Sequence, residues 1–394
     1  MDILFLSHCV PNPPDKGEKI RAWHELNLLA AKHRVHLACF AKNAEEVARA
    51  HELKDRCASV FAERLPPYRA LASAAFRFAA GGAISADFYR SKRMRRHIES
   101  LRRLPIDATL AYSSAVVQFA PADVPLWIDM VDVDSEKWLD YADRRWPGAL
   151  YRIEGNRLRA LEAAYARRAE CVFLTTPRER DLLKRIAPGA GVESYINGID
   201  FEYFNPAVCP AASGLENRRY VVFVGQMDYF PNVDACRWFA NAIFVQLRTQ
   251  WPNLEFLIVG RNPARAVQRL AAKPGITVTG GVADVRPYLS HALAMVAPLR
   301  IARGVQNKVL EALAMGKRIL ASPGVASSFG ETLPEGVSMC ESSEDYARQL
   351  EGMNDQPGCE PFIRERARAS FSWETNLRPL LEAMEGEERG AMIS

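Results

Sequence analysis

The stretch PLRIARGVQNKVLEALAMGKRILASP, residues 298–323, says most about how this chain folds. A short apolar run over 293–298 precedes a small-residue turn at Arg303 and Gly304, and a second apolar run covers 318–321. Between them, apolar residues recur at helical spacing: Val305, Val309, Leu310, Leu313 and Ala314. The segment therefore predicts a strand, a glycine turn, a helix and a second strand.

The start of this helix has the composition of an anion site. Gly304 lets backbone N–H groups approach a phosphate, the helix dipole favours it, and Lys308 adds a positive charge in the first turns. Glu311 follows one turn later, where its carboxylate is suited to accept hydrogen bonds from the vicinal hydroxyls of a ribose. One helix would then hold both ends of a nucleotide diphosphate. The alternative is a packing helix with a solvated charged face.

These residues also carry a family resemblance. Gly304, Lys308, Glu311, Ala312 and the turn at 316–317 resemble the donor-site helix of retaining glycosyltransferases with the GT-B fold, family four. The resemblance implies two glutamates eight positions apart, the first near the donor sugar and the second on the ribose. Glu311 matches the second, whereas Arg303 stands at the first position, which leaves open how the hexose is held.

Length and composition agree with a soluble protein of two domains. The chain has 394 residues, 48% of them apolar and 25% charged, and its net charge of +4 implies no general attraction to nucleic acid. Eight scattered cysteines without a CxxC pair favour reduced thiols in a cytoplasmic protein. The first ten residues, MDILFLSHCV, predict a buried strand rather than a signal peptide, and no apolar window is long enough to span a membrane.

Strand-like and helix-like segments alternate along the chain in two blocks, which predicts two doubly wound, Rossmann-like α/β domains facing across a cleft. The predicted strands of the first block cover 3–6, 35–40, 59–62, 108–111, 126–131, 171–174 and 193–196. Those of the second cover 220–224, 254–259, 276–278, 294–297, 319–321 and 337–339. Asn197-Gly198-Ile199-Asp200 forms a turn between the blocks and matches the interdomain hinge of the family.

The predicted domains are an N-terminal, acceptor-side domain over 1–198 and a C-terminal, nucleotide-sugar-binding domain over 199–374. A C-terminal helix over 375–394 follows, and packing back toward the N-terminal domain is one arrangement for it. Neither block carries the GxGxxG fingerprint after its first strand, which argues against a dehydrogenase.

The loop PNPPDKG, residues 11–17, follows the first strand and opens the first helix. The resemblance implies that this loop faces the cleft, that Gly17 allows close approach of the transferring sugar, and that Lys16, Lys19 and Arg21 lie on the acceptor side. A strand-to-helix turn with charged ends is the alternative for these three.

In the second block the resemblance implies a donor site with fewer charges than usual. Gln226 and Asn232 stand where many relatives place an arginine and a lysine, so Arg303 and Lys308 become the expected phosphate partners, with Arg261 and Arg300 behind them. The pattern resembles a subgroup associated with bacterial exopolysaccharide clusters of the exosortase (PEP-CTERM) type. The implied donor-binding residues are Gly225, Gln226, Asn232, Arg261, Gly304, Val305, Gln306, Asn307, Lys308 and Glu311.

Three carboxylates, Asp129, Asp132 and Asp134, stand where a predicted buried strand ends. Strand ends at a crevice are the usual place for reactive groups in open α/β sheets, and Asp132 best fits the implied position near the acceptor hydroxyl. Asp134 could instead cap a helix, and Asp129 could pair with an arginine. The expected catalytic residues are thus Asp132, Gly17 and Arg303. No metal is expected, because the acids lie far in sequence from the donor helix and no HExxH pattern occurs.

Residues 64–104 contain ten arginines and lysines against Asp87 and Glu99, next to a small apolar stretch at 70–80. A basic helix beside an apolar one is typical of contact with an anionic membrane surface, and an ordinary solvated helix is the alternative.

The expected function is therefore the metal-independent transfer of a hexose, with retention, from a nucleotide diphosphate sugar to a saccharide acceptor, lipid-linked in exopolysaccharide biosynthesis. The expected location is the cytoplasm, with peripheral attachment to the inner face of the plasma membrane. No cofactor and no nucleic acid partner are expected. A sugar-nucleotide epimerase and a noncatalytic glycosyltransferase-like subunit are the alternatives.

Overall fold

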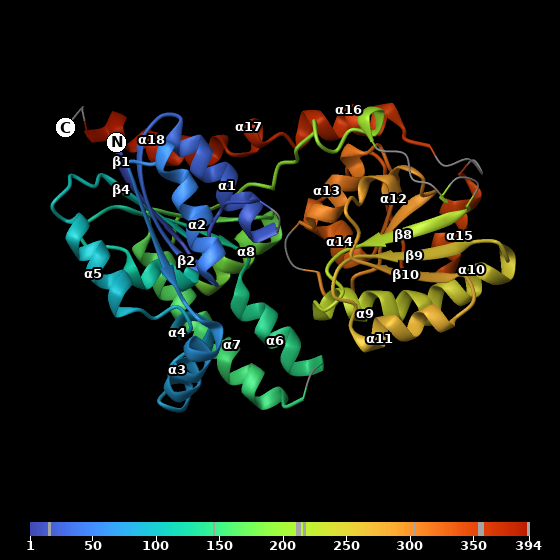
Figure 1. Ribbon diagram of the computed structural model, residues 1–394, viewed down its shortest axis with the longest axis horizontal. Helices are drawn as coiled ribbons and strands as arrows, with labels where there is room; N and C mark the ends of the chain where they lie inside the picture. The colour runs from blue at the N-terminus through green and yellow to red at the C-terminus, as the bar shows by residue number, and fades with distance from the viewer. Residues whose placement is uncertain are drawn as a thin grey trace. The chain divides into compact units, whose positions relative to one another are not determined.

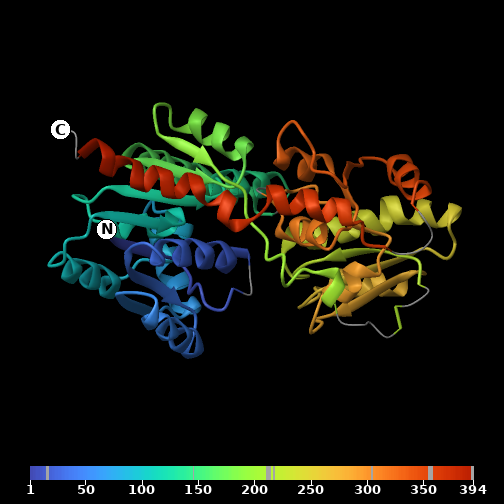
Figure 2. The ribbon, with the colours of Figure 1, turned by 90° about the horizontal axis from the view of Figure 1, so that it is seen from above.

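The computed structural model describes residues 1–14, 17–144, 146–209, 214–215, 218–302, 305–353 and 358–391. Contacts within the chain divide it into two compact units. Unit 1 comprises Met1–Tyr195 together with Leu377–Ser394, and unit 2 comprises Ile196–Asn376. Each unit is a parallel sheet covered by helices (Figure 1 and Figure 2).

The sheet of unit 1 has seven parallel strands in the order β3-β2-β1-β4-β5-β6-β7. The strands are β1 (Asp2–Ser7), β2 (Arg34–Ala41), β3 (Ser59–Arg64), β4 (Ala108–Tyr112), β5 (Leu126–Val131), β6 (Cys171–Leu174) and β7 (Val192–Ser194). Ile3 at the centre pairs with Val35 on one side and Ala108 on the other. The central strands are continuous apolar runs because helices cover both faces of a parallel sheet.

The helices of unit 1 come from both ends of its sequence. They are α1 (Gly17–Ala30), α2 (Ala44–His51), α3 (Pro67–Ala79), α4 (Ile84–Asp87), α5 (Lys92–Leu101), α6 (Asp134–Arg144), α7 (Gly148–Arg168), α8 (Pro177–Ile186) and α18 (Arg378–Ala391). The last of these runs along unit 1, where Glu385 lies 3.4 Å from Lys32 and from His33, just after α1 (Figure 1 and Figure 2).

Unit 2 repeats the design with six strands in the order β10-β9-β8-β11-β12-β13. The strands are β8 (Tyr220–Val224), β9 (Glu255–Val259), β10 (Ile276–Gly280), β11 (Ala294–Ala297), β12 (Ile319–Ala321) and β13 (Val337–Met339). The helices are α9 (Phe230–Trp238), α10 (Phe244–Gln250), α11 (Arg265–Gln268), α12 (Arg286–Ser290), α13 (Asn307–Ala314), α14 (Pro323–Ala326), α15 (Ser343–Glu351), α16 (Pro361–Ser370) and α17 (Trp373–Asn376).

The predicted fold class is confirmed, and each of the thirteen predicted strands is present with ends shifted by at most two residues. The strand order reverses beside β1 in unit 1 and beside β8 in unit 2, where β4 and β11 respectively take up the neighbouring place. Ligands of open α/β sheets bind at the carboxyl ends of strands next to such a reversal. The residues that follow β1, β4, β8 and β11 are therefore the first places to look for a site.

Candidate functional site

In unit 2, the ends of β8 and β9 are in direct backbone contact. Gly260 has a φ of +157°, and a Cβ added there would lie 1.6 Å from the carbonyl oxygen of Gly225. The Met227 N–H donates to the Arg261 carbonyl at 2.9 Å, which joins the two loops beyond the strands. A side chain at residue 260 would separate the loops, so this glycine is required by the geometry.

Lys308 reaches from the second position of α13 to the end of β8. Its Nζ donates to Asn232 Oδ1 at 2.6 Å and lies 4.4 Å from the centre of the Phe223 ring. Asn232 in turn donates from Nδ2 to the Gln226 carbonyl at 2.8 Å. Removal of water from the ammonium lowers the pKa of Lys308 to about 8. The lysine is therefore held in place, and its charge is sensitive to pH near neutrality.

Gly225 makes room for this pair. A Cβ at residue 225 would lie 2.8 Å from Asn232 Nδ2 and 3.1 Å from Lys308 Nζ. Both atoms are at the ends of side chains, so a larger residue would displace the lysine rather than the backbone. The glycine after β8 therefore leaves the space in which the Lys308 ammonium lies.

Glu311 lies one turn beyond Lys308 on α13 and is half-buried. Burial raises the pKa of Glu311 to about 7, although the charge of Lys308 opposes that rise. No side-chain hydrogen bond of Glu311 is found within the described part of the chain. The orientation of the helix is set by its buried face, which includes Val309, Leu310 and Leu313, and by the bond from Asn197 Nδ2 to Asn307 Oδ1 at 2.7 Å.

The other predicted donor residues have varied environments. Gln226 and Arg261 are exposed, Gln306 and Asn307 are half-buried at the start of α13, and Val305 is buried in the core. Arg300 pairs with Asp234 through Nε, 2.9 Å from Oδ2, so its charge is already matched. Arg303 and Gly304 lie outside the described residues, as does Lys16 in unit 1.

In unit 1, Asp132 follows a strained strand end. Val131 has a φ of +69°, rare for a β-branched residue, and Ser113 has a φ of +79° at the end of the neighbouring strand β4. Asp132 accepts a hydrogen bond from Thr175 Oγ1 at 2.8 Å. Burial and the nearby Glu179 raise the pKa of Asp132 to about 6. Strain of this kind gathers at functional sites, which supports Asp132 as a site residue.

Arg21, one of the predicted acceptor-side residues, is buried in unit 1. Its guanidinium is fully buried, donates from Nε to Asp129 and from Nη1 to the Tyr195 carbonyl at 3.0 Å, and lies 3.9 Å from the centre of the Tyr195 ring. Burial raises the pKa of Asp129, but Arg21 outweighs this effect and holds that pKa below its usual range. Within unit 1 this guanidinium joins α1 to Asp129 of β5 and to the Tyr195 carbonyl, and its acceptor-side role stays a prediction.

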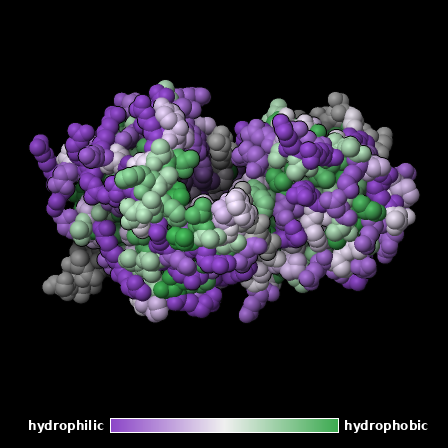
Figure 3. Space-filling model, turned by 90° about the horizontal axis from the view of Figure 1, so that it is seen from below, coloured by the Kyte–Doolittle hydropathy of each residue, from purple (hydrophilic) through white to green (hydrophobic). Residues whose placement is uncertain are grey.

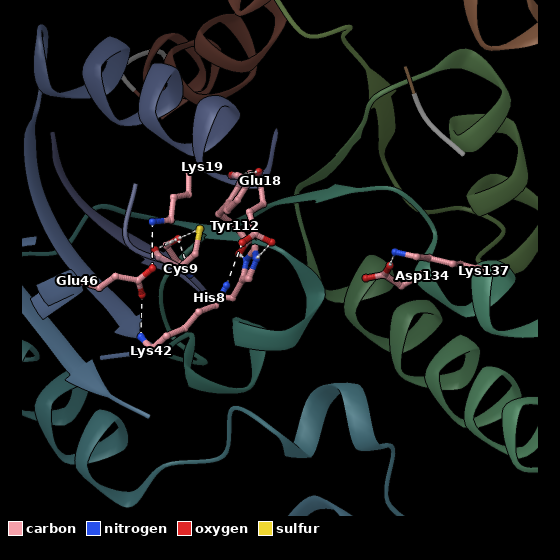
Figure 4. Close-up of polar contacts among 10 residues, drawn as sticks. His8, Cys9, Glu18, Lys19, Lys42, Glu46, Tyr112, Asp134 and Lys137 are labelled. Atoms are coloured by element: carbon pink, nitrogen blue, oxygen red, sulfur yellow. Dashed lines mark hydrogen bonds and ion pairs between the residues drawn. The ribbon is translucent and has the colours of Figure 1, made fainter. Parts of the chain in front are cut away.

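Lys19 is also buried, with Nζ donating to Glu46 Oε1 at 3.0 Å, whereas Gly17 is exposed as the first residue of α1. Lys19 belongs to a polar cluster at the carboxyl ends of β1 and β2 that the sequence reading missed (Figure 4). His8 Nδ1 donates to the Tyr112 carbonyl at 3.2 Å, and its Nε2 lies 3.9 Å from Glu18 Oε2. Lys42 Nζ donates to Glu18 Oε1 at 3.2 Å.

In this cluster the neighbouring His8 holds the pKa of Glu18 well below its usual range, against the effect of burial. His8 and Lys42 each directly follow the end of a central strand. That position was the signal available in the sequence, by the same strand-end rule that selected Asp132. Figure 4 also shows Asp134 and Lys137 on α6, 3.7 Å apart and away from the cluster, so Asp134 has a local partner.

Comparison with known proteins bears on unit 2 first. Residues 218–353 match the family model described as glycosyl transferases group 1. The matched segment contains Gly225, Asn232, Lys308 and Glu311. No curated protein matches the chain in sequence.

Solved structures share the fold of the whole chain. Sucrose-phosphate synthase from Thermosynechococcus elongatus has a TM-score of 0.68 at 16% identity, over 100% of this chain and 99% of its own. Anabaena HepE in complex with UDP-glucose has a TM-score of 0.62 at 13% identity, over 98% and 100%. A glycosyltransferase from Rickettsia africae has a TM-score of 0.61 at 13% identity, over 98% of each chain. The two parallel-sheet units thus have the GT-B fold.

Unit 2 supplies one ammonium and one carboxylate from a single helix, α13, and a glycine follows each of the strands β8 and β9. Such a set is able to bind an anionic group and a pair of hydroxyls. Among the described residues, no cluster of three or more histidine, cysteine, aspartate or glutamate side chains is suited to a metal ion.

Proposed function

We propose that the protein transfers a hexose from a nucleotide diphosphate sugar to a saccharide acceptor, with retention at the anomeric carbon. The observation that carries this proposal is that Lys308 and Glu311 lie one turn apart on α13. Lys308 is fixed by Asn232, and the carboxylate of Glu311 has no hydrogen-bonding side chain among the described residues. HepE, a protein of similar fold, has been solved with UDP and with UDP-glucose, which supports a donor of this class.

In the proposed reaction the start of α13 and Lys308 bind the diphosphate, and Glu311 accepts hydrogen bonds from the ribose hydroxyls. Arg303 supplies the further positive charge that Gln226 and Asn232 lack. Catalysis rests on positioning and on stabilising charge at the leaving diphosphate, without a metal. The leaving phosphate assists deprotonation of the acceptor on the same face of the sugar. Asp132 acts near the acceptor hydroxyl, and Gly17 allows close approach of the transferring sugar.

The proposed acceptor is a lipid-linked saccharide of exopolysaccharide biosynthesis, and the proposed location is the cytoplasmic face of the plasma membrane. The basic helix α5 supports attachment by charge. It buries Met94, Ile98 and Leu101 against its own unit, which leaves Lys92 and Arg93 on the outward side. No helix of the described residues is long and apolar enough to cross a bilayer.

A panel of UDP- and GDP-sugars tests the proposal. Release of nucleoside diphosphate that depends on a saccharide acceptor, with retention seen by NMR at the new linkage, is the expected result. A sugar altered without any acceptor would identify an epimerase. Tight binding without turnover would identify a noncatalytic subunit. This is the main competing function, because the residues at 226, 232 and 303 differ from those that the resemblance implies.

A further inference from the structure

Strand β5 departs from regular geometry directly before Asp132. Its pairing with β6 shifts by one residue between Asp129 and Val131, which is a bulge in the strand. Val131 has the φ of +69° described above, which is strained for a β-branched residue. Bulges bend a strand and redirect the side chains beside them, and they are frequent next to active sites. The end of β5 is therefore shaped at the residues that determine where the Asp132 side chain points.

Hydrogen bonds hold this strained strand end on the β5 side. The Val131 N–H donates to Asp129 Oδ1 at 2.9 Å, and the Val131 carbonyl accepts from the Thr175 N–H at 2.8 Å. The Asp132 N–H donates to the Met130 carbonyl at 2.9 Å. A strained backbone persists only where its surroundings over-determine it, and these bonds do so on both sides of Val131.

The connection from β6 to α8 contacts Asp132 and the residue after it. Thr175 Oγ1 donates to Asp132 Oδ1 at 2.8 Å, and Glu179 Oε2 accepts the Val133 N–H at 2.8 Å. Thr175 and Glu179 are both buried. Thr176 lies between them and caps α8, because its Oγ1 accepts the Glu179 N–H at 3.1 Å. The cap fixes the first turn of α8, and with it the start of the Glu179 side chain.

Thr175 and Glu179 act on the Asp132 carboxylate in opposite directions. A hydroxyl that donates to a carboxylate stabilises its ionised form, whereas a second carboxylate nearby disfavours that form. Burial is the largest cause of the raised pKa of Asp132, about 6, and the charge of Glu179 adds to the rise. The hydrogen bond from Thr175 opposes it.

Other charged groups around Asp132 have partners of their own. Asp134 and Lys137 of α6 lie 3.7 Å apart, and they shift the pKa of Asp132 in opposite directions. Asp129 of β5 is paired with Arg21. Of the charges that act on Asp132, that of the α8 carboxylate has the largest effect.

Helix α7 carries a comparable carboxylate that is directed elsewhere. Glu162 is buried, as Glu179 is, and accepts the Ser135 N–H at 3.1 Å. Burial raises the pKa of Glu162 to about 8, so this group is mostly neutral where Asp132 titrates. Figure 3 views the molecule from the side on which α6 and α7 lie in Figure 1, and hydrophilic and hydrophobic side chains are mixed on that surface of unit 1. Neither buried glutamate belongs to that surface.

We infer that Thr175 and Glu179 are positioning residues for Asp132: Thr175 holds its carboxylate, and Glu179 holds the backbone after it and controls its charge. The inference rests on the proposed function for the part that Asp132 plays in transfer. The contacts themselves belong to unit 1 and are present without a substrate.

Carboxyl-carbon NMR of protein with labelled aspartate tests the inference, and Asp132→Asn identifies the signal. The native signal should titrate with a midpoint of about 6. Glu179→Gln removes the charge but keeps an oxygen that can accept the Val133 N–H, so the midpoint should fall. Thr175→Val removes the hydroxyl at nearly constant volume, so the midpoint should rise. Each shift should be about half a pH unit or more.

Two matched variants serve as controls in the same titration. Thr175→Ser keeps a hydroxyl at the same position, so the midpoint of Asp132 should return to the native value. Glu162→Gln replaces the comparable buried glutamate of α7, which is mostly neutral at this pH, and should also leave the midpoint unchanged.

The same shifts should appear in transfer. With a soluble acceptor and saturating donor, kcat should fall as the pH decreases through the midpoint of Asp132, because a protonated carboxyl is a poorer acceptor for the substrate hydroxyl. Glu179→Gln should move this fall to lower pH, and Thr175→Val should move it to higher pH. Saturating donor separates this effect from the titration of Glu311 and Lys308 on donor binding.

Midpoints that stay at the native value in both variants, or that move in the same direction, would overturn the inference. If the loss of a buried charge prevents Glu179→Gln from folding, Thr175→Val decides alone. NMR midpoints that shift while the fall in kcat does not follow would overturn the positioning role in transfer. Absence of acceptor-dependent transfer by the native protein would instead reject the proposed function, and the NMR midpoints would still show whether Thr175 and Glu179 control Asp132.

Discussion

Glu311 and Lys308 both titrate close to neutral pH. A bound nucleotide needs the deprotonated form of Glu311 and the protonated form of Lys308. Burial raises the pKa of Glu311 to about 7 and lowers that of Lys308 to about 8. The ribose needs an ionised carboxylate as acceptor, and the phosphates need a protonated ammonium. Affinity for a nucleoside diphosphate should therefore rise as the pH increases toward about 7 and fall above about 8. The two apparent pKa values of this profile belong to the pair of residues together.

Substitution of Glu311 separates the rise in affinity below about pH 7 (the acidic limb) from the fall above about pH 8 (the alkaline limb). Glu311→Gln should remove the acidic limb and keep the alkaline limb. Calorimetry with UDP and GDP over a range of pH measures both. Glu311→Ala should weaken binding by about 1.5 to 3 kcal/mol, the range for a hydrogen bond to a charged group, without a change in Tm. Glu331→Ala, at an exposed glutamate of the same unit, is the control. An acidic limb that persists in the glutamine variant would rule out the ribose contact.

Arg303 gives a second prediction at the scale of one residue. In the proposed function Arg303 supplies positive charge to the departing diphosphate, because Gln226 and Asn232 carry none. Arg303→Ala should lower transfer by orders of magnitude, more in kcat than in KM if the contact tightens as the phosphate leaves. Arg303→Glu introduces the glutamate that the family resemblance implies at this position, and yet it should not restore activity. Native activity in the glutamate variant would place the phosphate contact elsewhere.

At the scale of elements, Gly225 after β8 and Gly260 after β9 have different roles. Gly260→Ala places a Cβ 1.6 Å from a backbone oxygen at a φ of +157°, so we expect a loss of about 1–3 kcal/mol or more in the free energy of unfolding. Gly225→Ala meets only the ends of Asn232 and Lys308, so it should lower affinity for the nucleoside diphosphate with little change in stability. Thermal unfolding and calorimetry on both variants distinguish the two, and the reverse pattern would contradict the assignment.

Helix α5 is the element whose charge should govern attraction to membranes. Replacement of Lys92, Arg93, Arg95 and Arg96 by glutamine removes four charges, each contributing about 1 kcal/mol near an anionic surface, so partitioning should fall by roughly three orders of magnitude. The residual binding should depend less on salt. The matched control replaces four basic residues of α8: Arg178, Arg180, Lys184 and Arg185. If the control lost as much binding, net charge rather than α5 would be the cause.

The elements also separate what the sequence could predict from what it could not. Strands such as β4 and β8 were predictable because a strand buried on both faces is an uninterrupted apolar run. The burial of Arg21 was not predictable, because α1 carries polar residues on its buried side and Asp129, the partner of Arg21, is 108 residues away. For Asp129 the sequence suggested an arginine as partner without identifying it. In the same way, Lys308 was predicted as a cation, but its bond to Asn232 and its shifted pKa depend on tertiary contacts.

At the scale of the whole molecule, unit 1 depends on the C-terminal helix. Leu377, Leu380 and Met384 recur at helical spacing and are buried, and Glu385 lies close to Lys32 and His33. Leu380→Ala should destabilise unit 1 by about 2–5 kcal/mol, as for a buried leucine, whereas Glu382→Ala on the exposed face should not. Hydrogen exchange should show weaker protection of β1 to β7 and unchanged protection of β8 to β13. Equal loss in both units would mean that α18 stabilises the molecule as a whole.

The place of α18 in unit 1 also bears on how the protein is made. A ribosome releases residues 196–376 before residues 377–391, so all the residues of unit 2 emerge while unit 1 still lacks a helix of its core. The first unit to be started is thus the last that can reach its final packing. During synthesis the buried apolar residues that α18 covers stay exposed until residues 377–391 have left the ribosome. A stall or cleavage near residue 376 would therefore leave a finished unit 2 attached to an unfinished unit 1, a form that chaperones and proteases would be able to recognise.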